Sequence, residues 1–222
     1  MLAKKLISKK IPYVNSNTLG KEILNIMKIN EVSFIPIVDN KEFIGLISES
    51  ELIEHSFENK LIKNFKFPTV NNFVYENQHI FEIIEKFVKL NLTAIVVLNK
   101  DDEYFGVISS ETLISGFSKL TSMHERGALI VLEMNSNDYS LIEISQIIEG
   151  NDAKILSLYI EMPNDSSRLE LTLKINTSNL SSIIQSLERY NYFIKSMYFE
   201  DKQMNNFYKN RYDEFMNYIN IS

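Results

Sequence analysis

The feature that most constrains the fold is a short stretch that the chain contains twice. Residues 43–53 read FIGLISESELI, and residues 104–114 read YFGVISSETLI. Each copy has an aromatic residue, a glycine, two aliphatic residues, a serine-rich polar stretch and a second apolar pair. The glycines, Gly45 and Gly106, lie 61 positions apart, which indicates that a unit of about that length was duplicated.

The residues around the first copy predict a helix, a buried strand, a return strand and a second helix. Leu19, Ile23, Ile26, Met27 and Ile29 have the spacing of one helix face. The compact apolar run that follows is too short for a helix and predicts a buried strand. The predicted elements are a helix within 18–32, strands at 33–39 and 43–48, and a helix at 50–57.

The residues around the second copy predict the same four elements in the same order. The predicted elements are a helix at 77–92, strands at 93–98 and 104–109, and a helix at 110–120. A chance match of short apolar runs rarely preserves four elements and their register around a glycine. The sequence therefore predicts an internal duplication across residues 1–120.

The pattern changes after Leu120, where a polar stretch at 121–127 predicts a linker. The predicted elements that follow are strands at 128–134, 154–162, 168–175 and 192–200, with helices at 140–150 and 179–191. This βαββαβ order is the ferredoxin-like arrangement. Apolar and polar residues alternate along 168–175, which predicts an antiparallel sheet with one face in water.

The complete prediction is an α/β (α+β) chain of two repeated domains, a ferredoxin-like domain and a final helix. The predicted boundaries are 1–60, 61–121, 127–201 and 202–222. The final helix rests on apolar residues at helical spacing, namely Tyr208, Tyr212, Phe215 and Ile219.

Composition excludes several classes of function. The net charge is −6, so a broad phosphate-binding face and a nucleic-acid partner are not expected. The chain has no cysteine, which removes disulfides, thiol nucleophiles and thiolate metal sites. No apolar run approaches the length of a membrane span, so no membrane partner is expected and the cytoplasm is the expected location.

The two copies resemble a tandem pair of CBS domains. The resemblance rests on residues 34–52, FIPIVDNKEFIGLISESEL, and residues 93–113, TAIVVLNKDDEYFGVISSETL. The third unit, from Gly127 to about Asp201, is similar to an ACT domain by its element order. A CBS pair followed by an ACT domain is similar to the acetoin-utilisation accessory-type CBS-ACT proteins.

The resemblance implies two clefts between the copies that take adenosine-containing ligands such as AMP, ADP, ATP or S-adenosylmethionine. In the family a motif hydroxyl approaches the phosphate, a motif Asp holds the ribose, and backbone near the buried strand meets the adenine. A helix N-terminus can offer N–H groups to an anion, and a carboxylate can accept ribose hydroxyls.

Carrying the motif over residue by residue gives one set of candidates in each copy. Ser48 and Ser109 stand at the hydroxyl position, and Glu51 and Thr112 stand where the family has Asp. The remaining first-copy candidates are Thr18, which is also predicted to cap the first helix, and the strand residues Ile35, Pro36 and Ile37. The residues interpreted as second-copy counterparts of Pro36 and Thr18 are Ile95 and His79.

The ACT resemblance departs from the family at its ligand turn. Members that bind amino acids have a glycine in the first strand–helix turn, where this chain has Tyr139 and Ser140. A side chain there obstructs the close approach of a ligand. Dimerisation into a homodimer is therefore the expected role of this domain.

Ordinary structural roles explain part of the motif as well. Ser48 and Glu51 fit a capping box, in which the serine caps a helix and the glutamate reaches back. Three histidines, His55, His79 and His124, have no metal-ligand spacing, and no nucleophile–base arrangement is evident. An enzyme is therefore not expected. Two hypotheses stay open: a sensor of an adenine-nucleotide-type ligand that acts on an unknown regulated protein, and a scaffold module that binds none.

Overall fold

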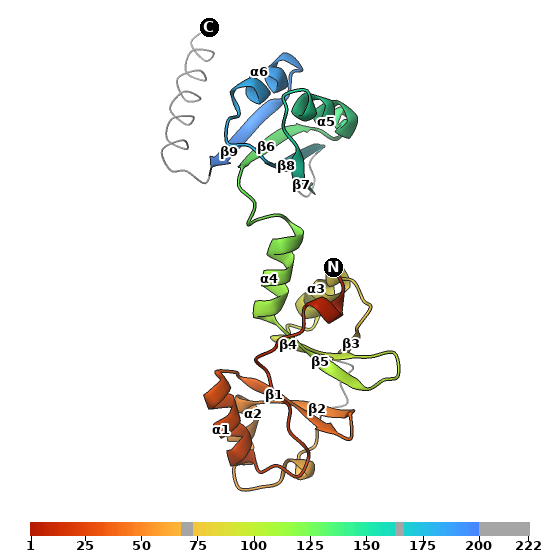
Figure 1. Ribbon diagram of the computed structural model, residues 1–222, viewed down its shortest axis with the longest axis vertical. Coiled ribbons are helices and arrows are strands. Elements are labelled where there is room, and N and C mark those ends of the chain that lie inside the picture. The colour runs from red at the N-terminus through yellow and green to blue at the C-terminus, as the bar shows by residue number, and fades with distance from the viewer. Residues whose placement is uncertain (68–72, 163–166, 200–222) are drawn as a thin grey trace. The chain divides into compact units, whose positions relative to one another are not determined.

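The computed structural model describes residues 1–67, 73–162 and 167–199. The chain divides into two compact units, Met1–Leu120 and Thr121–Ser222, and each is described by itself (Figure 1). The final helix predicted at 202–222 lies outside the described residues. Of the described helices, none is long and apolar enough to cross a membrane.

The first copy of the repeat forms a two-stranded antiparallel sheet with two helices. Its elements are α1 (Gly20–Asn30), β1 (Phe34–Asp39), β2 (Glu42–Ser48) and α2 (Glu49–Glu54). Short 3₁₀ turns lie before these elements, at Ala3–Lys5, and after them, at Ile62–Asn64. Val14 adds an isolated parallel bridge to Ile37 of β1. The predicted order of elements is confirmed.

The second copy repeats this arrangement, and its parallel bridge is extended into a strand. Its elements are β3 (Phe73–Tyr75), α3 (Ile80–Lys89), β4 (Ala94–Leu98), β5 (Tyr104–Ser109) and α4 (Ser110–Leu120). β3 pairs parallel with β4, and β4 pairs antiparallel with β5. Val74 of β3 lies opposite Val97, as Val14 lies opposite Ile37 in the first copy.

The two glycines of the repeat occupy matching places. Gly45 lies opposite Ile37 and Gly106 lies opposite Val97, and the strand register shifts directly after both pairs. A Cβ built on Gly45 would lie 2.2 Å from the Phe67 ring, and one built on Gly106 would lie 2.5 Å from Ile7 Cγ2. The missing side chain at Gly45 leaves room for Phe67, which precedes the second copy. The missing side chain at Gly106 leaves room for Ile7, which precedes the first copy. The predicted duplication is confirmed.

The strand register corrects one alignment made from the sequence. Pro36 pairs with Leu46, one position from the glycine pair, and the residue at that place in the second copy is Val96, which pairs with Val107. Val96, and not Ile95, is therefore the counterpart of Pro36. The sequence comparison placed the counterpart one residue too early, because two short apolar runs can be aligned in more than one register and only the strand pairing decides between them.

The start of α1 corrects a second prediction. The N-cap residue is Leu19, which makes no side-chain capping bond, and Thr18 lies outside the helix. The Thr18 carbonyl accepts the N–H of Ile62 instead, at 3.0 Å. His79 is the N-cap of α3, so it matches Leu19 in place and not Thr18.

The first unit buries one core in each copy and a third at the seam between the copies. Ile62, from beyond the first copy, packs in the first core with Ile23 and Ile47, whereas Ala3 and Leu6 pack in the second core. Each copy therefore completes the core of the other. The seam core contains Ala94, Val96, Leu98 and Val107, with Ile11, Phe34, Phe43, Leu46, Phe73 and Tyr104 packed against it.

The second unit is a four-stranded antiparallel sheet with two helices. Its elements are β6 (Ala128–Asn135), α5 (Leu141–Glu149), β7 (Ile155–Glu161), β8 (Arg168–Ile175), α6 (Ser181–Arg189) and β9 (Phe193–Phe199), with a 3₁₀ turn at Ser136–Asp138. The strand order is β7-β8-β6-β9. The predicted ferredoxin-like arrangement is confirmed.

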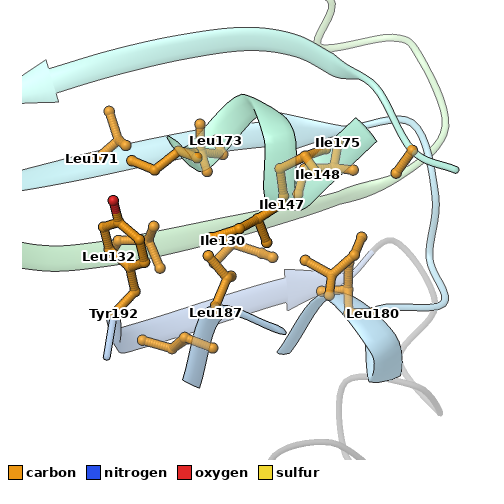
Figure 2. Packing of buried hydrophobic residues seen from close by; sticks show 14 of the residues in the cluster. Ile130, Leu132, Ile147, Ile148, Leu171, Leu173, Ile175, Leu180, Leu187 and Tyr192 are labelled. Atoms are coloured by element: carbon orange, nitrogen blue, oxygen red, sulfur yellow. The ribbon is translucent and has the colours of Figure 1, made fainter. Parts of the chain in front are cut away.

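The core of this unit lies between the sheet and the two helices (Figure 2). Leu169, Leu171, Leu173 and Ile175 of β8 are all buried, as their alternation predicts. Lys174 departs from the predicted solvent face, because it is 7% exposed. The sheet therefore has one face that is buried against the helices, and a second face on which the exposure of the side chains varies along β8.

Candidate functional site

A pocket opens at the seam of the two copies, beside the start of α2. Its volume is about 260 Å³. The first copy supplies Phe34, Phe43, Ile44, Gly45, Leu46, Ser48 and Glu51, the second copy supplies Asn91, Leu92, Thr93 and Ala94, and the connecting segment supplies Phe67. We call this cavity the seam pocket. It brings together two candidates from the first copy, Ser48 and Glu51.

Ser48 and Glu51 form a closed capping box at the start of α2. The Ser48 N–H donates to Glu51 Oε2 at 2.8 Å, and the Glu51 N–H donates to Ser48 Oγ at 3.2 Å. The Ser48 hydroxyl also donates to Glu51 Oε2, at 2.6 Å. The box stabilises the short helix by about 1 kcal/mol and holds both side chains at the rim of the pocket.

The first turn of α2 has few N–H groups left for an anion. The Glu49 N–H donates to the carbonyl of Ser33 at 3.0 Å, and the Glu51 N–H is held by Ser48 Oγ. The general argument that a helix start offers N–H donors to a phosphate therefore loses most of its force here.

The corresponding candidates of the second copy are joined in the same way. The Ser109 N–H donates to Thr112 Oγ1 at 3.1 Å, and the Thr112 N–H donates to Ser109 Oγ at 3.3 Å. The Thr112 hydroxyl donates back to the Ser109 carbonyl at 3.1 Å. Thr112 thus replaces the carboxylate in the capping geometry but brings no charge.

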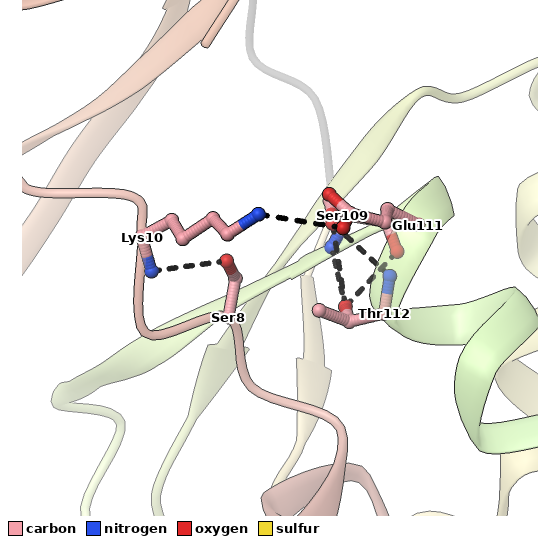
Figure 3. Close-up of polar contacts among 5 residues, drawn as sticks. All are labelled: Ser8, Lys10, Ser109, Glu111 and Thr112. Atoms are coloured by element: carbon pink, nitrogen blue, oxygen red, sulfur yellow. Dashed lines mark hydrogen bonds and ion pairs between the residues drawn. The ribbon is translucent and has the colours of Figure 1, made fainter. Parts of the chain in front are cut away.

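The N-terminal segment runs alongside this second motif (Figure 3). The Ser8 N–H donates to the carbonyl of Val107 at 2.8 Å, and Lys10 Nζ lies 3.5 Å from Glu111 Oε1. Ile7 contacts Gly106 from the same segment. Ser109 and Thr112 do not line the seam pocket.

The strand candidates and Thr18 lie outside the seam pocket. Ile35 and Ile37 are both 0% exposed and belong to the first core. The Pro36 carbonyl accepts the Val14 N–H at 3.1 Å. Neither these three residues nor Thr18 line the pocket.

Sequence reasoning missed the part of the pocket that the second copy and the connecting segment supply. Phe67 stands 60 positions after Ile7, and both contact a repeat glycine. An alignment of the two segments that precede the copies could therefore have identified Phe67 as a candidate. The segment from Asn91 to Ala94 had no such signal. Its place at the pocket follows from the packing of one copy on the other.

A larger hollow of about 670 Å³ lies at one end of the ferredoxin-like sheet. Its polar side chains bond to one another: Tyr192 Oη donates to Glu143 Oε2 at 2.6 Å, and Arg168 Nη1 lies 2.6 Å from Glu133 Oε1. Burial, followed by the bond to Glu143, raises the pKa of Tyr192 above its ordinary value. Ser140, at the turn where amino-acid-binding relatives have glycine, caps α5 by accepting the Glu143 N–H at 3.3 Å.

A metal centre has no support from the part of the chain that the structure describes. Within that part, no three His, Asp or Glu side chains gather closely enough to hold an ion. His79 has a structural role, since its Nδ1 accepts the Phe81 N–H and its Nε2 lies 3.0 Å from the Met1 amino group.

Comparison with known proteins identifies the repeated unit. Residues 3–58 and 66–119 match the family model described as the CBS domain. The chain contains a tandem pair of CBS domains, followed by a C-terminal α/β region with the four antiparallel strands and two helices of an ACT-like domain.

Several solved structures are similar in part. A CBS domain pair/ACT domain protein from Thermotoga maritima is 18% identical, with a TM-score of 0.47 over 54% of this chain and 98% of that chain. The CBS domains of a transcriptional regulator from Streptococcus pneumoniae are 13% identical, with a TM-score of 0.47 over 52% and 98%. The protein CBSX2 in complex with AMP is 11% identical, with a TM-score of 0.46 over 53% and 96%.

Proposed function

We propose that this protein is a non-catalytic regulatory protein that senses an adenosine-containing ligand in the seam pocket. CBS pairs commonly bind adenine nucleotides, and the chain contains such a pair. The observation that carries the proposal is the seam pocket itself, in which Ser48 and Glu51 face a cavity lined by three phenylalanines. Aromatic faces suit a purine, and a carboxylate suits ribose hydroxyls.

The pocket is well placed for regulation because both copies line it. A ligand there contacts β2 and the start of α2 on one side and residues 91–94 on the other. It can shift an equilibrium only if it binds one arrangement of the copies better than another. A ligand that contacts both copies has the means to do so.

A thermal melt with a ligand panel tests the proposal. The purified full chain is melted with and without adenosine, AMP, ADP, ATP and S-adenosylmethionine. A ligand at 100 times its Kd stabilises the folded state by about 2.7 kcal/mol, which is a readily measured shift. Unchanged melts with every member of the panel would contradict the sensor proposal.

The second candidate function is a scaffold module without a ligand, and the second copy favours it. Ser109 and Thr112 bond to each other, and the segment from Ile7 to Lys10 runs beside them. These contacts argue against a ligand in the second copy alone. For the sensor, we therefore propose one ligand for each chain, bound in the seam pocket. A titration that gives two sites per chain would contradict this stoichiometry.

We further propose that the ACT-like domain forms a homodimer through the edge strand β7. Among the described strands, β7 pairs with β8 alone, and Tyr159 and Ile160 on it are 39% and 41% exposed. A second copy of the strand could pair along the open edge. Light scattering after gel filtration is expected to give a dimer for the natural chain and a monomer for Ile160→Lys, whereas a dimer of the variant would contradict the use of this edge.

A further inference from the structure

The large hollow of the ferredoxin-like unit has the size of a small-molecule site. Its volume of about 670 Å³ lies within the roughly 300–1,000 Å³ that is typical of ligand pockets. Its lining comes from the end of β6, the turn that follows, the first turn of α5, the start of β8, and the segment that joins α6 to β9. We call this cavity the sheet-end hollow. Among the described residues, it shares no lining residue with the seam pocket.

Aromatic side chains form one part of the lining of the sheet-end hollow. Tyr190 and Phe193 are 50% and 48% exposed, so both rings are open to a ligand. An aromatic face attracts an organic cation. Arg189 Cζ lies 5.9 Å from the centroid of the Tyr190 ring, which shows that a cation can lie over a ring at this end of the sheet. The aromatic lining therefore favours a ligand with an apolar body and a positive charge.

Two carboxylates of the lining are bonded to neutral partners. Tyr192 Oη donates to Glu143 Oε2 at 2.6 Å, and the Asn135 side-chain amide donates to Asp138 Oδ2 at 3.1 Å. Among the described residues, no lysine or arginine forms an ion pair with Glu143 or Asp138. The charge of both carboxylates is therefore available to a cationic ligand.

The two carboxylates act on the same point of the hollow. Burial, then the bond and the charge of Glu143, and then the charge of Asp138 raise the pKa of the Tyr192 hydroxyl. Both carboxylates must lie near that hydroxyl to have this effect. The third carboxylate of the lining, Glu133, is bonded to Arg168. The described lining therefore has three carboxylates and one guanidinium, which leaves a net charge of −2.

The same lining is unsuited to a ligand that carries a carboxylate. Arg168 is the one cation among the described residues that line the hollow, and its Nη1 already lies 2.6 Å from Glu133 Oε1. At the start of α5, the Glu143 N–H donates to Ser140 Oγ at 3.3 Å. An added carboxylate would also lie near Glu143 and Asp138, and like charges repel at short range. An amino acid is therefore less favoured here than the amine that remains when its carboxylate is removed.

We propose that the sheet-end hollow is a binding site for a small organic cation, namely an alkyl ammonium or guanidinium compound without a carboxylate. Glu143 and Asp138 bind its charged group, and the rings of Phe193 and Tyr190 contact its apolar body. This site gives the protein a second ligand. It does not rest on the proposed function, since it uses none of the residues of the seam pocket.

Calorimetric titration of the full chain with two matched pairs of probes tests the class of ligand. Agmatine is arginine without its carboxylate, and cadaverine is lysine without its carboxylate. Each amine is expected to bind at least about fivefold more tightly than its parent amino acid, because one like charge at about 4 Å has an effect of that order in water. The difference is expected to shrink at high salt, which screens charges that are open to solvent.

Variants in the lining locate the site. Glu143→Gln retains an acceptor for the Tyr192 hydroxyl but removes the charge, so it is expected to weaken the binding of both amines about fivefold or more. Phe193→Leu removes the ring but retains an apolar side chain, and it is expected to weaken both amines as well. Glu149→Gln removes the same charge at the far end of α5, outside the lining, and is expected to leave both affinities unchanged. Circular dichroism shows whether each variant is folded, and Asp138→Asn on its exposed turn gives the same test if Glu143→Gln is not.

Each outcome bears on a different part of the inference. Amine binding that weakens in Glu143→Gln but not in Glu149→Gln would support the site. Arginine and lysine that bind as tightly as their amines would overturn the preference for a ligand without a carboxylate. Amine binding that neither Glu143→Gln nor Asp138→Asn alters would overturn the assignment to this hollow. The absence of binding by both amines at millimolar concentration would overturn the inference as a whole, and would leave the sensor proposal for the seam pocket as it stands.

Discussion

At the scale of single residues, small changes of side chain separate the two copies of the repeat. Glu51 has a carboxylate where its counterpart, Thr112, has a hydroxyl, and both maintain the same capping geometry. The fold therefore tolerates either residue, while the charge of the pocket depends on which is present. This difference makes the first copy the better candidate for binding.

The repeat glycines provide a direct test of packing. Gly45→Ala is expected to lower the free energy of unfolding by about 1–3 kcal/mol, because its Cβ would lie 2.2 Å from the Phe67 ring. Urea unfolding measures the change. In the double variant with Phe67→Ala the two effects are expected to be less than additive, since the clash is removed. Strict additivity would show that the contact with Phe67 is not the cause.

At the scale of elements, helix α3 begins with bonds that depend on a charge. The Glu82 carboxylate accepts the His79 N–H at 2.9 Å and the Gln78 side-chain amide at 3.0 Å. The bond from the His79 backbone, more than any other cause, holds the pKa of Glu82 below its ordinary value of 4.5. A carboxylate whose pKa is lowered by folding stabilises the folded state only while it is ionised.

The first unit is therefore expected to lose stability as the pH is lowered, because the start of helix α3 loses the contribution of ionised Glu82. The contribution of Glu82 is present above a pH of about 4.5 and is lost as the pH falls through the lower pKa of the folded state. Glu82→Gln retains acceptor oxygen but cannot titrate, so its unfolding free energy should change less between about pH 6 and pH 3. Glu85→Gln on the exposed side of α3 is the control for net charge, and an equal flattening in both variants would contradict the role of Glu82.

At the scale of the whole molecule, each unit has its own core. The three clusters of the first unit are drawn entirely from residues 1–120, and the cluster of the second is drawn from residues 128–199. The copies within the first unit are not independent in this way. Ile62 completes the first core from beyond the predicted boundary at residue 60, and Leu6 completes the second core from within the first copy.

Fragments of the chain can test this organisation. A fragment of residues 1–120 is expected to unfold in a single cooperative urea transition, because its cores need no residue from the second unit. A fragment of residues 1–60 is expected to stay unfolded, since it lacks Ile62 and the seam core. Cooperative unfolding of the shorter fragment would show that the exchanged segments are not essential.

Several features of this protein could be predicted from the sequence because they depend on local pattern. The helices and strands follow the spacing of apolar residues, and the duplication follows from a repeated string around Gly45 and Gly106. The capping box could also be predicted, since Ser48 and Glu51 stand three residues apart and bond within one helical turn. Each of these depends on residues that are close together along the chain.

The features that depend on residues far apart in the chain were decided by the tertiary structure. The strand register identified Val96 as the residue of the second copy that corresponds to Pro36. Packing brought Phe67 and residues 91–94 to the same cavity as Glu51. The set of side chains that share this cavity with Glu51 could be seen only there. The physical reason is that a pocket is the space left between packed copies, and its shape and charge depend on side chains that the chain itself does not place side by side.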